Sequence, residues 1–285
     1  MFNSGLKSKL LVNEIVSPIS RELRKTNTKL KTVFHEYGLM AEDALFGQVF
    51  KNPDRLIRQA MILLPAKAIG NNHDDHELIK LCVAAEIFYS VIDLWDGIHD
   101  SEIVDRKLPG THKIIDNSRA ILAGDTLLTL ALMLVAEIFP ENMLLKVIRQ
   151  IEKASYLIIS EEIQKRPLYE SVEKYCDTMK QQTTEFSNTV IELGAYLTKA
   201  DAEESAIVEK CGYNLAMAYK IIMDQASGKI GFANLDTQIA IKQYAEEAEC
   251  AISGFKKSVY QKSLLKLVEY FYNFGEERLA KEVAY

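Results

Sequence analysis

Glycine and proline are scarce in this chain, with 13 glycines and 6 prolines among 285 residues. Both residues mark tight turns, so their scarcity disfavours an all-β protein with many hairpins. Long alternation of Val, Ile and Thr with polar residues is also missing, which argues against a sheet. The longest apolar stretch, residues 120–139, contains Asp125 and is not expected to span a membrane. We therefore expect an all-α protein without a transmembrane segment.

Cysteine is also rare, and its four positions, Cys82, Cys176, Cys211 and Cys250, are widely scattered. Neither a CxxC pair nor a Cys/His zinc pattern occurs, and the first residues lack a secretory hydrophobic region. These features predict reduced thiols and a cytoplasmic location. The net charge of −6 argues against a nucleic-acid partner. Small anionic substrates would need local cations or a metal ion.

Apolar residues recur at helical spacing along most of the chain. The expected helical segments are residues 20–35, 52–70, 71–96, 117–139, 169–197, 201–225, 243–255 and 259–281. The segment at residues 117–139 is apolar on nearly every face, so we expect a central, buried helix there. Loops are short and no low-complexity linker is present. The pattern predicts one domain of about ten helices over residues 1–285.

Three aspartates follow the apolar run at residues 81–92, namely Asp93, Asp96 and Asp100. Offsets of three, four and seven residues place side chains on one face of a helix. Carboxylates so close together repel one another unless a cation lies between them, which indicates a metal site. The alternative is a solvated acidic face at an exposed helix end.

Several segments resemble, in the same order, the trans-prenyltransferases, the polyprenyl diphosphate synthase family. They are AAEIFYSVIDLWDGIHD at residues 84–100, AILAGDTLLTLAL at 120–132, IELGAYL at 191–197, CGYNLAMAYKIIMDQ at 211–225 and YAEEAECAI at 244–252. In addition, Pro109 falls where the family's RRGxPT proline falls. The similarity covers most of residues 50–275. It implies an isoprenoid-synthase-type helical bundle around a central cavity and prenyl diphosphates as ligands.

The resemblance also implies a magnesium site, because two aspartate-rich motifs on facing helices of the family bind Mg²⁺ and the diphosphate. In the first motif, DDxxD, this chain keeps the outer acids as Asp96 and Asp100, with Gly97 at the second position. In the second motif only Asp224 remains, after Met223. The predicted metal ligands are therefore Asp96, Asp100 and Asp224.

Five residues at the family's cationic and polar positions are predicted to bind diphosphate. They are Arg55, Arg58, Arg106, Thr183 and Lys220. The alternative for Arg55 and Arg58 is that both are ordinary surface charges, since a three-residue spacing is common on any helix. No residue is assigned a catalytic role.

The departures from the family pattern bear on function. Asp105 stands where the family has an arginine, Gln182 where it has a lysine, and Met223 where it has an aspartate. In the family, a lysine-bearing loop and further helices follow the second motif. In this chain, residues 227–248 lead almost directly from that motif to the closing helices. The favoured hypothesis is a non-catalytic or weakly active subunit, in a homodimer or in a heterodimer with a full-motif prenyltransferase. The alternatives are an active prenyltransferase or terpene-synthase-like enzyme with an altered metal site, and a protein that only binds prenyl diphosphates.

Overall fold

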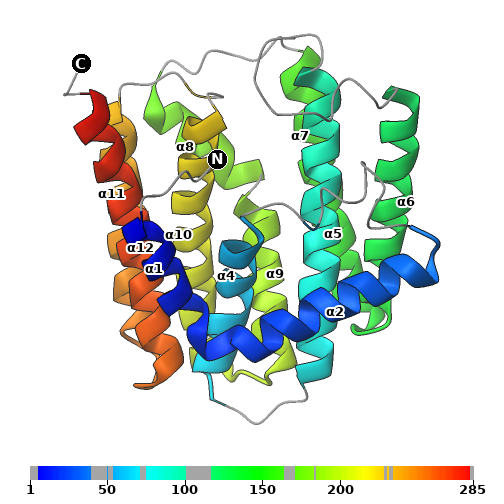
Figure 1. Cartoon of the computed structure of the whole chain (residues 1–285), viewed down its shortest axis with the longest axis horizontal. Coiled ribbons are helices and arrows are strands. Elements are labelled where there is room, and N and C mark those ends of the chain that lie inside the picture. The colour runs from blue at the N-terminus through cyan, green and yellow to red at the C-terminus, as the bar shows by residue number, and fades with distance from the viewer. Residues whose placement is uncertain are drawn as a thin grey trace. The chain divides into compact units, whose positions relative to one another are not determined.

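The computed structural model describes residues 6–39, 50, 54–70, 75–100, 117–163, 171–182, 184–227, 230 and 234–282. These residues form eleven α-helices and one short 3-10 helix, with no strand among them (Figure 1). The elements are α1 (Leu6–Val16), η1 (Ser17–Ile19), α2 (Ser20–Glu36), α4 (Arg55–Ala68), α5 (Asp75–Asp100), α6 (Asn117–Ala136), α7 (Glu141–Ile163), α8 (Val172–Gln182), α9 (Thr184–Leu197), α10 (Ala202–Ser227), α11 (Asn234–Ile252) and α12 (Val259–Glu282). The predicted all-α class is confirmed.

Most predicted segments differ from the observed helices by a few residues at their ends, and two differ more. Residues 169–197, predicted as one long periodic segment, are divided into α8 and α9 on either side of Thr183. The closing segment predicted at residues 243–255 belongs to α11, which begins earlier, at Asn234. None of the described helices is long and apolar enough to cross a membrane.

The chain groups into two compact units, each built from segments far apart in the sequence. Unit 1 comprises Met1–Ser20, Leu56–Asp74 and Arg166–Tyr285, and unit 2 comprises Arg21–Arg55 and Asp75–Lys165. The predicted single domain and central cavity stay predictions.

Unit 2 is organised around α5, which packs against α6 and α7. Every side chain from Leu81 to Phe88 is buried, including the carboxylate of Glu86. A helix buried on all sides needs apolar residues at nearly every position, which this stretch supplies. The single acid in it must find an internal partner, because an unpaired buried charge is very costly.

Unit 1 is organised around α10, which packs against α8, α9, α11 and α12, while α1 packs on α12 (Figure 1). The crossing of α9 and α10 depends on Gly212. A Cβ atom there would lie 2.7 Å from Asn188 Oδ1 and 3.0 Å from Ile191 Cγ2. Glycine at this position therefore lets α9 and α10 approach closely. The second acidic segment lies further along the same α10 helix, so this packing helps to fix its position.

The predicted central, buried helix at residues 117–139 is wrong as stated, because α6 exposes one face. Leu122 is 65% exposed and Ile121 is 47% exposed. The hydroxyls of Thr126 and Thr129 on the same face donate to carbonyl oxygens of their own helix, at 2.8 Å and 3.1 Å. Because these hydroxyls bond to the backbone of their own helix, the two threonines add little polarity to the exposed face of α6.

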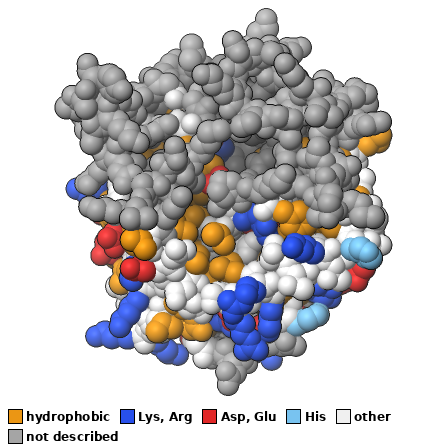
Figure 2. All heavy atoms as spheres, in the orientation of Figure 1, with side chains coloured by type: hydrophobic (Ala, Val, Ile, Leu, Met, Phe, Trp, Pro, Cys, Tyr) orange, Lys and Arg blue, Asp and Glu red, His pale blue; other side chains and the backbone are white. Residues whose placement is uncertain are grey.

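The α2 helix is strongly amphipathic. Thr26, Leu30, Val33 and Phe34 form its buried stripe. The exposed side carries Arg21, Arg24, Lys25 and Lys31. Figure 2 shows Lys and Arg side chains gathered over the part of the molecule that α2 crosses. The overall acidic charge is thus unevenly distributed, and α2 is a local basic face.

The four cysteines are free thiols, and only Cys250 is exposed. Burial raises the pKa of the Cys211 thiol to about 12, and burial next to Glu86 raises the pKa of Cys82 as well. Since the thiolate is the reactive form, a buried thiol with a raised pKa is inert.

We expect a single fast-reacting thiol in the native protein and four in denaturant, measured with an aromatic disulfide reagent. The substitution Cys250→Ser should remove the fast phase. A second fast thiol in the native protein would contradict the burial of the other three cysteines.

Candidate functional site

The first acidic motif lies at the end of α5, in unit 2. This helix runs to Asp100, so Asp93, Asp96 and Asp100 share one continuous helical backbone, as their spacing predicts. The side chains of these three aspartates lie outside the described residues. The prediction that Asp96 and Asp100 bind a metal therefore stays a prediction.

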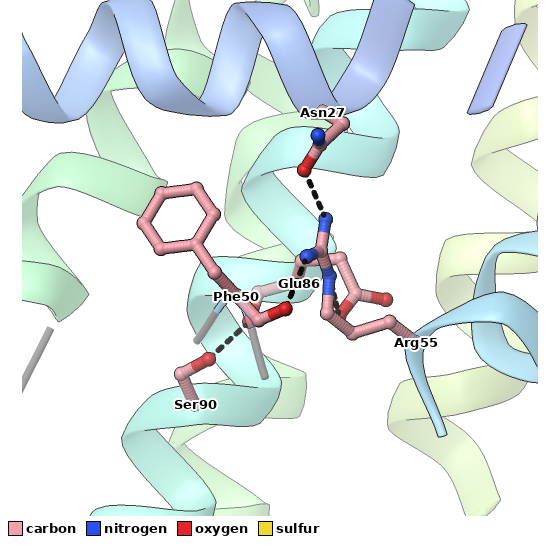
Figure 3. Close-up of polar contacts among 5 residues, drawn as sticks. All are labelled: Asn27, Phe50, Arg55, Glu86 and Ser90. Carbon is pink, nitrogen blue, oxygen red and sulfur yellow. Dashed lines mark hydrogen bonds and ion pairs between the residues drawn. The ribbon is translucent and has the colours of Figure 1, made fainter. Parts of the chain in front are cut away.

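Arg55, the first residue of α4, lies in a polar cluster of unit 2 (Figure 3). Its Nε atom is 3.6 Å from Glu86 Oε2, and its Nη1 and Nη2 atoms donate to the Phe50 carbonyl at 3.3 Å and to Asn27 Oδ1 at 3.5 Å. The guanidinium carbon lies 5.9 Å from the centroid of the Phe50 ring. Three segments of unit 2 therefore meet at this guanidinium.

This arrangement shows that Arg55 is not an ordinary surface charge. The residue is 8% exposed, and the side chain of Glu86 is fully buried. Charged groups are buried where they are paired and hydrogen-bonded, and Arg55 supplies a cation beside the Glu86 carboxylate. Its predicted diphosphate contact is untested, and its guanidinium is already engaged with Glu86.

The remaining predicted diphosphate residues fall in different places. Arg58, on α4 in unit 1, is 5% exposed, so the surface-charge alternative is wrong for it too. Arg106 and Thr183 lie outside the described residues. Lys220 lies on α10 in unit 1, where it meets the acid of the second motif.

The second motif is a hydrogen-bonded triad of Lys220, Asp224 and Tyr175. Lys220 Nζ lies 2.9 Å from Asp224 Oδ1, and the Tyr175 hydroxyl on α8 donates to Asp224 Oδ2 at 2.7 Å. The side chain of Asp224 is 8% exposed, and Tyr175 is completely buried within α8 and its neighbours. Both oxygens of this carboxylate thus accept bonds from groups of the chain itself.

Sequence reasoning missed Tyr175, because no motif includes it and 49 positions separate it from Asp224. The pairing of Lys220 with Asp224 was accessible from the sequence, since residues four apart on a helix face each other. The neighbouring Gln225 donates to the Thr237 hydroxyl at 2.7 Å and links α10 to α11. The segment around Asp224 is therefore tied to two other helices of unit 1.

A magnesium ion needs several hard oxygen ligands. Within the described ranges, no group of three or more His, Cys, Asp and Glu residues could hold a metal ion. Asp224 already has the ammonium of Lys220 as its counter-ion. Its surroundings fit an ion pair better than a dedicated magnesium ligand, and its predicted metal role stays untested.

Comparisons with known proteins support the fold and the family. The chain is 24% identical to a geranylgeranyl diphosphate synthase of Methanosarcina mazei over 59% of its own length and 53% of that protein. It is 25% identical to a geranylfarnesyl diphosphate synthase of Aeropyrum pernix over 64% of its own length and 60% of that protein. The match thus spans little more than half the length of these relatives.

A solved structure has the same fold. It is a polyprenyl synthase from Caulobacter crescentus complexed with calcium and isoprenyl diphosphate, with a TM-score of 0.72 and 16% identity. The comparison covers 92% of this chain and 97% of that one. The isoprenoid-synthase type of helical fold is therefore confirmed.

The family model described as polyprenyl synthetase matches residues 43–227, well over half of the chain. The matched range includes both acidic motifs and all five predicted diphosphate residues. The chain belongs to the polyprenyl synthetase family.

Proposed function

We propose that this protein is a cytoplasmic, non-catalytic or weakly active subunit of a heteromeric trans-prenyltransferase, and that it binds prenyl diphosphates. The observation that carries this proposal is the state of the second motif. Its one remaining acid, Asp224, is bonded to Lys220 and Tyr175, and Met223 replaces the acid before it. The relatives named as geranylgeranyl and geranylfarnesyl diphosphate synthases support prenyl diphosphates as ligands.

Magnesium in such a site would stabilise the negative charge on a departing diphosphate. We propose that Asp96 and Asp100 hold it weakly, together with oxygens of the diphosphate itself. Two carboxylates from one helix are too few for a dedicated magnesium site, and this ion is commonly completed by phosphates and water. The second motif adds no free carboxylate pair, so a complete metal cluster is not expected.

This metal proposal predicts that Mg²⁺ raises the melting temperature only when pyrophosphate is present. Substituting Asp96→Ala together with Asp100→Ala should abolish that rise, because no other carboxylate pair is proposed to share the ion. The matched control is Glu173→Ala with Asp177→Ala, two exposed acids also four residues apart on α8. A rise that survives in the Asp96/Asp100 variant would place the magnesium elsewhere.

Two alternative functions remain open. The buried cation Arg58 and the retained acids Asp96 and Asp100 favour an active enzyme with an altered metal site, or a simple prenyl-diphosphate-binding protein. Product analysis with isopentenyl and allylic diphosphates plus Mg²⁺ separates the three functions. A subunit gains activity when its partner is added, an enzyme is active alone, and a binding protein forms no product in either case.

The partner surface that we propose is the exposed face of the α6–α7 pair in unit 2. Its exposed apolar residues are Ile121, Leu122, Leu145 and Ile148, each between 42% and 65% exposed. Isolated apolar residues on a surface need no explanation, but a series along two packed helices is typical of a covered face. We propose that a second chain, either a copy or a full-motif relative, covers it.

This surface predicts that Leu122→Glu together with Ile148→Glu converts a dimer into a monomer, because the new charges would be buried without partners. Light scattering coupled to size-exclusion chromatography measures the mass directly. Leu10→Glu is the control, since Leu10 is 55% exposed on α1 in the other unit. A variant that remains dimeric would exclude the α6–α7 face as the interface.

A further inference from the structure

The triad at the second motif holds one lysine in a fixed position. Tyr175, from α8, and Lys220, one turn before Asp224 on α10, bind opposite oxygens of the same carboxylate. Such bonds to an ionised group are shorter and stronger than neutral ones. Because the carboxylate is restrained from two helices, the ammonium that it holds is restrained as well.

The Lys220–Asp224 ion pair is not arranged in the order that best stabilises the α10 helix. Placing the cation N-terminal to the acid at this spacing is the less favourable order with respect to the helix dipole. The side chain of Asp224 is also largely desolvated, at 8% exposed, which costs free energy unless both oxygens are bonded. The arrangement instead fixes the direction of the Lys220 ammonium.

The Lys220 ammonium has N–H donors that its bond to Asp224 does not use. It carries three N–H donors, and Asp224 is its one acceptor among the described residues. Its side chain is 23% exposed, so the remaining donors can reach a ligand from solvent. An anionic oxygen is the ligand that such a restrained ammonium binds best.

We propose that Lys220 binds a phosphate oxygen of a diphosphate directly and takes the place of a metal ion at the second motif. Asp224 and Tyr175 act as positioning residues for this lysine. The ammonium neutralises the one acid present, so no uncompensated carboxylate is left to attract a divalent cation. This inference rests on the proposed binding of prenyl diphosphates and specifies how the second motif takes part in it.

Calorimetric titration with inorganic pyrophosphate in EDTA tests the proposal. The parent protein should bind without metal, and Lys220→Met should bind about tenfold more weakly or worse, as expected for loss of a charge-assisted hydrogen bond. Lys220→Arg should retain most of the affinity. The matched control is Lys180→Met, which removes an exposed lysine that pairs with Asp177 on α8 and should leave the affinity unchanged.

Tyr175→Phe provides a second variant that keeps Lys220 but removes the hydrogen bond from the Tyr175 hydroxyl to Asp224 Oδ2. It should weaken binding in EDTA only a few-fold, because Lys220 keeps its own contact with the ligand and loses only part of the restraint on its position. A titration with Mg²⁺ present completes the experiment. If Asp224 were a metal ligand, Tyr175→Phe would change affinity only in the magnesium titration, which would overturn the inference.

The outcomes separate this inference from the function on which it rests. Pyrophosphate binding that requires Mg²⁺ and is equal in the parent and Lys220→Met overturns the role of Lys220 but leaves the proposed function intact. No binding of pyrophosphate or of geranylgeranyl diphosphate, with or without Mg²⁺, overturns the proposed function itself. Melting curves of each variant identify any loss of binding that is due to unfolding.

Discussion

The purified protein alone should form prenyl product at no more than about 10⁻²–10⁻³ of the rate of a full-motif relative, the usual effect of losing one group that stabilises a departing oxyanion. The family resemblance implies that three such groups are missing at once, at Asp105, Gln182 and Met223. Groups that act as a unit do not contribute independently, so the three losses need not multiply. The loss of any one of them is already severe.

Product analysis with radiolabelled isopentenyl diphosphate, an allylic diphosphate and Mg²⁺ measures this rate. Because the lost groups act together, Met223→Asp alone should not restore turnover. A purified homomer that turns over at rates ordinary for enzymes would contradict the subunit proposal and favour the altered enzyme.

The second large effect is expected at the Arg55–Glu86 pair. Replacing Arg55 by Met should lower the free energy of unfolding by about 3–5 kcal/mol, since it removes a buried cation from beside the buried carboxylate of Glu86. For a chain of this size each kcal/mol shifts the melting temperature by roughly 2–4 °C. Chemical denaturation followed by circular dichroism measures the loss.

Two controls make this test specific. The double variant Arg55→Met/Glu86→Leu should recover most of the stability, because replacing a whole buried pair by apolar groups is often neutral or stabilising. Lys80→Met, which breaks the partly exposed pair with Glu137, should cost at most about 1 kcal/mol. An Arg55 variant of unchanged stability that loses pyrophosphate binding would show that the arginine serves the ligand and not Glu86.

Most of the helices could be predicted from the sequence because their apolar residues follow the helical repeat, but α1 and α7 were not among the predicted segments. Spacing alone predicted the observed start of α2 at Ser20. It also predicted that Asp93, Asp96 and Asp100 lie on a helix, and α5 does extend to Asp100. The division of this segment into α8 and α9 was not visible in the sequence, because the apolar repeat continues from one helix into the next. Periodicity reports which face of a helix is apolar and does not report where one helix ends and the next begins.

Burial was harder to predict than helical structure. Residues 117–139 are apolar on nearly every face, yet α6 leaves Leu122 exposed. Apolar character alone does not show which residues are buried in the core, because apolar residues also occur on surfaces. Conversely, Arg55 and Arg58 could be surface charges by their spacing, and both are buried. A charge is buried only where a partner compensates it, and Glu86 is far from Arg55 in the sequence.

The candidate site was predictable only in part. The family resemblance identified the acidic motifs, and four-residue spacing accounts for Lys220 with Asp224. Tyr175 and Asn27 could not be found, because they reach Asp224 and Arg55 through packing of distant segments. Such tertiary hydrogen bonds leave no local pattern in the sequence.

The most direct test of the central claim is product formation by a complex of this chain with any full-motif prenyltransferase that co-purifies from its host. Acids are removed from one chain at a time, Asp96 and Asp100 here or the corresponding motif acids of the partner. Turnover should largely persist when the acids of this chain are removed and should be lost when those of the partner are removed. Loss of turnover with Asp96→Ala/Asp100→Ala in this chain, and persistence with the altered partner, would contradict a non-catalytic role.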